Sequence, residues 1–371
     1  MFKQVIGQDD IKARLINEAR SGRVPHAILF TGPSGCGKLA LAIAFARYLL
    51  CEHPSENDAC GKCPSCRTSL GFVHPDLHFV YPIIKYKKTE TSICEAYIKE
   101  WRQRLEQGLY FDLEDWLADM KAENQQVLIY AAESEQIQRK LSLKSTLGGR
   151  KVMVIWMPEK MHPTCANKLL KLIEEPPTDT IFLLVSDEPE KILPTILSRT
   201  QRIEIKGIAP SKIAEAIQQY HPAEDATLVA RTAQGSYTAA LKAIDRSRDN
   251  DLFLDLFIML MRLSYQRKIK DMRKWSEQIA SMGRERQKNF LDYCQRLIRE
   301  NFIYNFRQPE LNYMRQKEAD FAKNFARFVN ERNVIKIMDE LSDAARDIEQ
   351  NTNPKMVFFD FALKMIVLLI Q

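Results

Sequence analysis

The sequence predicts an α/β domain with a parallel sheet, followed by an all-α part. Through about residue 207, short apolar runs alternate with helical segments, and the runs that we interpret as strands are 26–32, 76–82, 151–157, 180–186 and 201–207. After residue 207 the strand patterns end, and amphipathic helical patterns continue to the C-terminus. Apolar strands that alternate with helices are typical of a parallel sheet that is covered on both faces.

The elements follow one another in a regular order. The first strand, HAILFTG, leads into a glycine-rich turn, and KLALAIAFARYLLC after it has helical spacing. The segment TCANKLLKLIEE between the third and fourth strands is helical and is stopped by Pro176 and Pro177. Residues 83–135 are longer than a usual connection, and they place Ile93, Tyr97, Trp101 and Leu105 roughly on one helical face. We therefore interpret residues 83–135 as an inserted helical excursion.

The helical part of the sequence divides in two. Residues 208–248 predict a compact helical subdomain, and residues 249–371 predict a separate helical bundle. The terminal run MVFFDFALKMIVLLI is shorter than the about 18 uninterrupted apolar residues of a membrane span. It also carries Asp360 and Lys364, so we expect a buried terminal helix.

Composition and charge indicate a globular protein of two or three domains. The chain has 371 residues, of which 45% are hydrophobic and 27% charged. Its net charge of +6 is a mild basic bias, which is compatible with an anionic partner but does not require one. The start MFKQVIGQDD lacks the apolar core of a signal peptide, so we expect a cytoplasmic chain.

A phosphate-binding loop is predicted between the first strand and the helix after it. Gly32, Gly37 and Lys38 fit the pattern G-x-x-x-x-G-K-[ST], in which backbone N–H groups bind phosphate and the lysine reaches the terminal phosphates. The last position holds Leu39 in place of Ser or Thr, so the loop offers no side-chain oxygen to Mg²⁺. The alternative is a glycine-rich turn that arose by chance.

The third strand also lacks a group for the metal. An active nucleotide hydrolase would carry an acidic residue at the end of this strand, whereas this chain has Trp156 and Met157, followed by Pro158 and Glu159. Two positions that would hold magnesium are therefore apolar. Their joint loss predicts an abandoned active site.

Four cysteines have the spacing of a metal site. Cys51, Cys60, Cys63 and Cys66 form the pattern C-x8-C-x2-C-x2-C, and four thiolates satisfy tetrahedral zinc. Four protein ligands close the site, so we predict structural Zn²⁺, with free thiols as the alternative. The nearby histidines are surplus to this set and are interpreted as ordinary surface or loop residues: His53, His74 and His78. The other cysteines are expected to be core thiols: Cys36, Cys94, Cys165 and Cys294.

Several motifs together resemble a known family. They are VIGQ (5–8), VPHAILFTGPSGCGK (24–38), the four-cysteine module, HPD (74–76), ANKLLKLIEEPP (166–177) and EPEKILPTILSRTQ (188–201). These motifs resemble bacterial clamp-loader subunits of the AAA+ class, and most of all the delta-prime type of DNA polymerase III subunit. The resemblance covers about residues 1–82 and 135–245, and the helical tail agrees in type only.

The resemblance implies an architecture and a role. It implies an AAA+ domain over 1–207 that contains the zinc module, a helical lid over 208–248, and a collar for oligomerisation over 249–371. ATP-hydrolysing gamma or tau subunits carry a lid arginine where this chain has Thr238. With Leu39, Trp156 and Met157, this departure implies a non-hydrolysing subunit in which the loop survives as scaffold, and residual ATP or ADP affinity through Lys38 is left open.

The resemblance also implies one catalytic residue. The family's Ser-Arg-Cys motif places an arginine finger in the ATP site of a neighbouring subunit, and the corresponding residues here are Ser198, Arg199 and Thr200. A guanidinium supplied in this way stabilises charge on the transferred phosphoryl group. From the residues alone, Arg199 is interpreted as an exposed arginine on a turn. The segment ANKLLKLIEEPP resembles part of the family's subunit interface. Without the resemblance it is interpreted as a solvated helix face.

The implied partners are gamma or tau and delta clamp-loader subunits, with the sliding clamp and primed DNA reached through the complex. Two other classes remain open. One is a working gamma-like or tau-like ATPase, which predicts turnover by the purified chain alone. The other is a zinc-dependent DNA-binding module, which predicts basic residues around the cysteines. The local sequence CEHPSENDACGKCPSCR mixes acids and bases, so the region around the cysteines is a weak candidate for a nucleic-acid surface.

Overall fold

The fold was analysed in a computed structural model. It describes residues 1–85, 92–122, 125–146, 149–221, 226–307, 312, 314–350 and 352–369. The internal contacts of the chain divide it into two compact units, Met1–Ile244 and Asp245–Gln371. Each unit is described by itself.

The first unit contains a five-stranded sheet with the order β2-β3-β4-β1-β5, in which every neighbouring pair is parallel. The strands are β1 (Ala27–Thr31), β2 (Leu77–Val80), β3 (Lys151–Trp156), β4 (Thr180–Ser186) and β5 (Gln201–Glu204). Every residue of β1, β3 and β4 is buried, as the unbroken apolar runs predict. The predicted parallel α/β fold is thereby confirmed.

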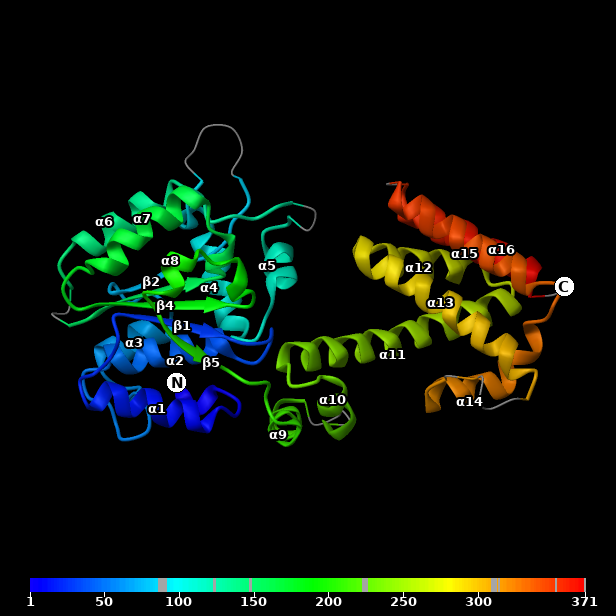
Figure 1. The fold of residues 1–371 in the computed structure, drawn as a ribbon. Coiled ribbons are helices and arrows are strands. Elements are labelled where there is room, and N and C mark those ends of the chain that lie inside the picture. The colour runs from blue at the N-terminus through cyan, green and yellow to red at the C-terminus, as the bar shows by residue number, and fades with distance from the viewer. Residues whose placement is uncertain are drawn as a thin grey trace. The chain divides into compact units, whose positions relative to one another are not determined.

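Helices cover both faces of this sheet (Figure 1). One face carries α1 (Asp9–Arg20), α2 (Lys38–Leu50) and α3 (Pro64–Leu70), and the other carries α6 (Glu133–Ser142) and α7 (Pro163–Glu174). Helix α2 is buried on all sides, and its alanines at 40, 42, 44 and 46 are all buried. The short helices α8 (Pro194–Leu197), η1 (Phe2–Gln4), η3 (Pro158–Lys160) and η4 (Pro189–Lys191) complete the connections.

The inserted segment forms η2 (Cys94–Tyr97), α4 (Ile98–Gln107) and α5 (Leu113–Asp119). Of its predicted face, Trp101 and Leu105 are buried, while Ile93 and Tyr97 are partly buried. Trp101 stacks on Tyr81 with ring centroids 4.1 Å apart. The insertion therefore shares the core of the sheet domain. Its residues 86–91 and 123–124 lie outside the described residues.

The remainder of the first unit is a small helical layer made by α9 (Pro210–Tyr220), α10 (Ala226–Thr232) and the start of α11 (Tyr237–Tyr265). Its core contains Ile213, Ile217, Ala230 and Tyr237. Residues 222–225 of the predicted subdomain 208–248 lie outside the described residues. Helix α11 runs through the predicted boundary at residue 248, and the two compact units divide within it.

The second unit is all-helical within the residues that the structure describes. It contains the rest of α11, α12 (Ile269–Ala280), α13 (Arg284–Tyr304), α14 (Gln316–Phe325), η6 (Ala326–Phe328), α15 (Val334–Glu349) and α16 (Pro354–Leu368). The predicted terminal helix is α16, and it buries Phe358, Phe361 and Met365. Among the described helices, none combines the length and the hydropathy needed to cross a membrane.

Candidate functional site: the phosphate loop and the cysteine cluster

The loop of residues 32–38, called the P-loop below, connects β1 to α2 at the carboxyl edge of the sheet. A Cβ atom at Gly32 would lie 2.1 Å from the carbonyl oxygen of Ile205, so no larger residue fits there. Gly35 and Gly37 have φ values of +76° and +90°, which side chains rarely adopt. These glycines fix the loop at the point where β1 lies between β4 and β5, the usual place for a ligand in an open parallel sheet.

The P-loop lysine is already engaged by the chain itself. The Lys38 side chain is 3% exposed, and its ammonium lies 2.7 Å from Asp187 Oδ1. It also donates hydrogen bonds to the carbonyl oxygens of Gly32 at 2.8 Å and Pro33 at 2.5 Å. All three donor positions of the ammonium are thus directed at oxygens of this chain. Asp187 follows β4 and was missed by the sequence analysis, because its contact with Lys38 is made only in the folded sheet.

The two positions that would hold magnesium are apolar and buried. Leu39 is 6% exposed, and Trp156 and Met157 at the end of β3 are 5% and 7% exposed. Glu159, the nearest acid after β3, instead accepts a hydrogen bond from the Asp187 N–H at 3.2 Å. Burial raises the pKa of the Glu159 carboxyl above its ordinary value.

Little space is left beside the P-loop. The cavity there has a volume of about 30 Å³ and is lined by Ser34, Gly35, Gly37, Lys38, Leu39, Leu109, Tyr110, Phe111, Trp156, Val185, Asp187 and Thr238. This volume admits one or two water molecules, whereas small-molecule sites measure about 300–1,000 Å³. Leu109, Tyr110 and Phe111 belong to the insertion, for which the sequence predicted helical structure but no role at this site.

Arg199 lies apart from this cavity, directly after α8. Its side chain is 39% exposed, and its Nε lies 2.7 Å from Glu174 Oε1 at the end of α7. Its Nη1 donates to the Thr195 carbonyl oxygen at 3.0 Å and to Ser198 Oγ at 3.2 Å. The structure therefore joins Arg199 to the segment ANKLLKLIEEPP through Glu174. The sequence analysis named both segments but did not predict this ion pair.

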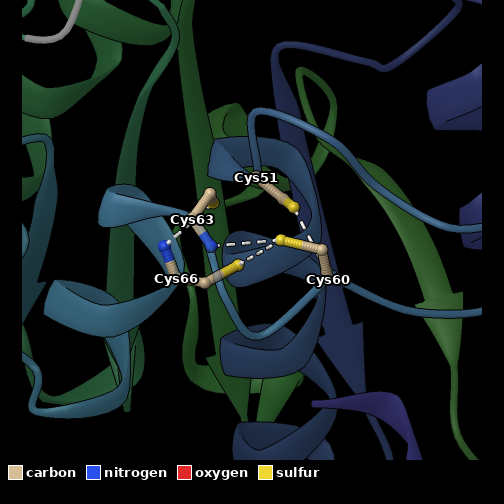
Figure 2. A group of neighbouring side chains, drawn as sticks. All are labelled: Cys51, Cys60, Cys63 and Cys66. Carbon is tan, nitrogen blue, oxygen red and sulfur yellow. Dashed lines mark hydrogen bonds between the residues drawn. The ribbon is translucent and has the colours of Figure 1, made fainter.

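The four cysteines Cys51, Cys60, Cys63 and Cys66, called the cysteine cluster, converge between the end of α2 and the start of α3 (Figure 2). Their Sγ atoms all lie within 4.8 Å of one another, and the cluster could hold a metal ion. Cys60 Sγ lies 3.8 Å from Cys66 Sγ. Sulfurs at the corners of a tetrahedron around zinc are about 3.8 Å apart, given a Zn–S distance near 2.3 Å. The chemistry and spacing of the donors therefore fit zinc.

Backbone N–H groups donate hydrogen bonds to three of these sulfurs. Cys60 Sγ accepts N–H groups from Lys62 and Cys63, both at 3.4 Å, and these bonds lower the pKa of the Cys60 thiol to about 6. Cys51 Sγ and Cys63 Sγ accept the N–H groups of Cys60 and Cys66 at 3.3 and 3.4 Å (Figure 2). At Cys60 these bonds favour thiolate, the form of cysteine that binds metals, whereas burial raises the pKa of the Cys51 and Cys66 thiols.

Two neighbours anchor the module that carries the cluster. Asp58 accepts the N–H groups of Phe2 and Lys3 at 3.0 and 3.1 Å, which ties the module to the start of the chain. His74 Nδ1 accepts the Asp76 N–H at 3.0 Å, so its Nε2 carries the proton and donates to Ser65 Oγ at 2.7 Å. His74 lies in a loop, as interpreted, but it is only 4% exposed. The same interpretation is wrong for His78, which lies in β2 and is partly buried. The role of His74 is to hold α3 against the strand β2.

Comparisons with known proteins give this geometry a family. The family model described as DNA polymerase III, delta subunit, matches residues 7–209. The chain is 34% identical over 188 residues to the DNA polymerase III subunit delta' of Pseudomonas aeruginosa, covering 50% of this chain and 45% of that protein. It is 28% identical over 233 residues to subunit delta' of Escherichia coli, covering 62% and 57%.

A second type of relative is also similar. The DNA polymerase III subunit tau/gamma of Haemophilus influenzae is 28% identical over 253 residues, covering 66% of this chain and 30% of that protein. A solved structure of a DNA polymerase III gamma subunit-related protein from Thermotoga maritima aligns over 97% of this chain and 99% of that chain, with 14% identity and a TM-score of 0.39. The chain spans between 30% and 57% of the length of the three curated relatives.

The match to the family model extends over more than half of the chain and includes the P-loop, the cysteine cluster, Asp187 and Arg199. The expected family resemblance is therefore confirmed. The chain belongs to the DNA polymerase III delta subunit family, and with it to the clamp-loader family of DNA polymerase III subunits.

Proposed function

We propose that this chain is the non-hydrolysing, delta-prime type of subunit in a clamp loader, and that it supplies Arg199 as an arginine finger to the ATP site of a neighbouring gamma or tau subunit. The observation that carries the proposal is the state of the P-loop lysine. Lys38 is buried, and Asp187 supplies its counter-charge at 2.7 Å. A lysine in this state offers no free charge to the phosphates of ATP.

The metal positions support the same role. Hydrolysis of ATP needs Mg²⁺ held by a P-loop hydroxyl and by an acid at the end of β3, which β4 separates from β1. Leu39, Trp156 and Met157 stand at these positions, and all three are buried. In this proposal Gly32, Gly37 and Lys38 remain as scaffold of the fold, with weak or no nucleotide binding.

Arg199 has the chemistry for a role in another subunit's site. A guanidinium is planar, permanently charged and able to donate several hydrogen bonds to phosphate oxygens. Its pairing with Glu174 joins two side chains that are 39% and 46% exposed, so the pair is weak and can be exchanged for phosphate. Glu174 would then act as a positioning residue that keeps Arg199 extended from α8 before a neighbour binds.

We further propose that the cysteine cluster holds structural Zn²⁺. The ion would be held by Cys51, Cys60, Cys63 and Cys66, and it would join the end of α2 to the start of α3. Four thiolate ligands leave no open coordination position for a substrate. Delta, gamma or tau subunits, the sliding clamp and primed DNA are the partners that the proposed role requires, with residues 249–371 as the collar.

The test mixes this chain with its cognate gamma or tau and delta subunits and measures ATPase stimulated by primed DNA. In the variant Arg199→Ala, turnover at the adjacent site should fall by on the order of 10³ to 10⁵, the range that arginine fingers contribute. Assembly, measured by gel filtration, should be unchanged. The matched control is Arg14→Ala, because Arg14 is also an exposed arginine paired with a glutamate, Glu18, at 2.9 Å. Unchanged turnover in an assembled Arg199→Ala complex would remove the arginine-finger proposal.

The second candidate is an active ATPase of the gamma or tau type. It is favoured by the similarity to the tau/gamma subunit of Haemophilus influenzae, which covers 66% of this chain. The purified chain alone distinguishes the two candidates when it is given ATP and Mg²⁺. Steady turnover that is lost in the variant Lys38→Met would establish this second candidate and overturn the first.

A further inference from the structure

The insertion enters the P-loop site with four consecutive residues, Leu109–Asp112, called the plug segment below. They follow α4 and lead into α5, and three of them line the cavity of about 30 Å³ beside Lys38. A Cβ atom at Gly37 would lie 3.0 Å from both Cε1 and the hydroxyl oxygen of Tyr110. The Tyr110 ring therefore rests directly on the P-loop backbone.

Tyr110 lies in the crevice beside the P-loop, where the remainder of a P-loop ligand is expected. When phosphates bind a P-loop, the rest of the ligand extends along the crevice at the carboxyl ends of the strands. Tyr110 stands in this crevice with Trp156 and Val185 from β3 and β4. Its hydroxyl oxygen accepts the Ile6 N–H at 2.8 Å, and its ring packs edge-on against Tyr237 at a centroid distance of 5.0 Å. A flat ring with an acceptor aimed at a backbone N–H resembles the chemistry of a bound purine base.

Asp187 supplies the other half of such a ligand. Its carboxylate lies on the Lys38 ammonium at 2.7 Å, the position that a phosphate oxygen would take. An aromatic ring and an anion from two separate segments thus satisfy the groups that normally bind a base and a phosphate. Burial raises the pKa of the Tyr110 phenol above its ordinary value.

The plug segment also joins the sheet to the small helical layer. Lys242 on α11 lies 2.5 Å from Asp112 Oδ2, and it lies 2.7 Å from Glu114 in α5. Gly35 accepts the Tyr237 N–H on its carbonyl oxygen at 2.9 Å. Contacts from the P-loop, the insertion and α11 therefore meet around Tyr110.

We propose that the plug segment and Asp187 act as an internal substitute for a purine nucleotide, and that they hold α9, α10 and the start of α11 on the sheet without any bound ligand. The inference concerns the chain's own P-loop and does not depend on the role of Arg199. The proposal gives the insertion a function, because its plug segment closes the P-loop site permanently where a nucleotide would otherwise bind reversibly.

Truncation of Tyr110 tests the proposal directly. In the full-length chain, Tyr110→Ala should open the crevice, so that ADP without Mg²⁺ binds at least about tenfold more tightly than to the wild type by calorimetric titration. Hydrogen exchange in residues 226–244 should become faster in this variant and slow again when ADP is added. Tyr110→Phe is the matched control, because it fills the same space and should bind no more ADP than the wild type.

Other results would overturn the proposal. They are ADP binding to the wild type as tight as to Tyr110→Ala, or a Tyr110→Ala chain that neither binds ADP nor exchanges faster in residues 226–244. If Tyr110→Ala does not fold, Lys242→Ala decides, because its change lies at a partly exposed ion pair. This variant should exchange faster both at residues 109–112 and at the start of α11, and unchanged exchange at both would reject the substitute role. Arg199→Ala should leave all these readings unchanged, so a failure here is distinct from a failure of the arginine finger.

Discussion

The P-loop and the cysteine cluster are both predicted ligand sites of the first unit. The chain itself satisfies the binding groups of the P-loop, whereas the four sulfurs of the cluster are arranged for a metal ion. At the P-loop, Asp187 and two carbonyl oxygens satisfy the Lys38 ammonium, and side chains of the insertion fill the space beside it. In the cysteine cluster, four sulfurs converge within 4.8 Å, and backbone N–H groups favour the thiolate form of Cys60. A motif thus indicates a scaffold, whereas the state of its donor and acceptor atoms indicates whether a ligand is still required.

The largest expected effect is at the cysteine cluster. Cys66→Ser should reduce the zinc content of the purified chain from about one ion to about none, because a structural zinc site needs all four of its ligands. The measurement is metal analysis of the purified chain, together with proteolysis of residues 51–66, which should become faster. Cys165→Ala is the control, since Cys165 is buried outside the cluster and should retain the metal. Equal zinc content in both variants would contradict the assignment of the cysteine cluster as the zinc site.

A medium effect is expected from the ion pair of the P-loop. Asp187→Asn leaves the Lys38 ammonium buried without its counter-charge, and the free energy of unfolding should fall by about 2 kcal/mol. This loss is below that for a fully buried pair because Asp187 is 26% exposed. Denaturant unfolding measures it, and the double variant with Lys38→Met should recover part of the loss.

The matched control for this ion pair is Glu188→Gln. Glu188 pairs with Lys191, but the two side chains are 38% and 57% exposed, so no measurable change is expected. If Asp187→Asn is as harmless as Glu188→Gln, the P-loop lysine is not satisfied from within, and the contrast between the two sites disappears.

The smallest expected effect is a difference in stability between alanine variants of two glycines with positive φ. At Gly22 φ is +69° and no described atom lies within 4 Å of an added Cβ, so Gly22→Ala should cost about 1 kcal/mol through backbone strain alone. At Gly37 the added Cβ also meets Tyr110 at 3.0 Å, and Gly37→Ala should cost about 1 kcal/mol more. Thermal unfolding of the two variants measures the difference. Combining Gly37→Ala with Tyr110→Ala should remove this extra cost, and a persistent difference would show that Tyr110 does not press on the loop.

Much of the fold could be predicted because the relevant patterns are local. The buried strands β1, β3 and β4 appear as unbroken apolar runs, and α2 follows the glycines that begin it. The cysteine pattern is equally local, since three of its four members lie within seven residues of one another. The apolar character of Leu39, Trp156 and Met157 was visible in the same way. Arg199 as an arginine finger and 249–371 as a collar remain predictions.

The contacts that close the P-loop could not be predicted from patterns. Tyr110 and Gly37 are separated by the whole of α2, α3, β2 and α4, and Asp187 meets Lys38 only because β4 pairs with β1. The burial of the loop residue His74 could not be predicted for the same reason, since its partner Ser65 lies in α3.

The sequence by itself determined the order of strands and helices, the loss of the magnesium ligands and the convergence of four cysteines, because each depends on residues that are neighbours along the chain. Only the tertiary structure decided that the insertion fills the P-loop site and that Asp187 neutralises Lys38. Hydrophobic periodicity records which face of a segment is buried, but it carries no information on which distant segment covers that face.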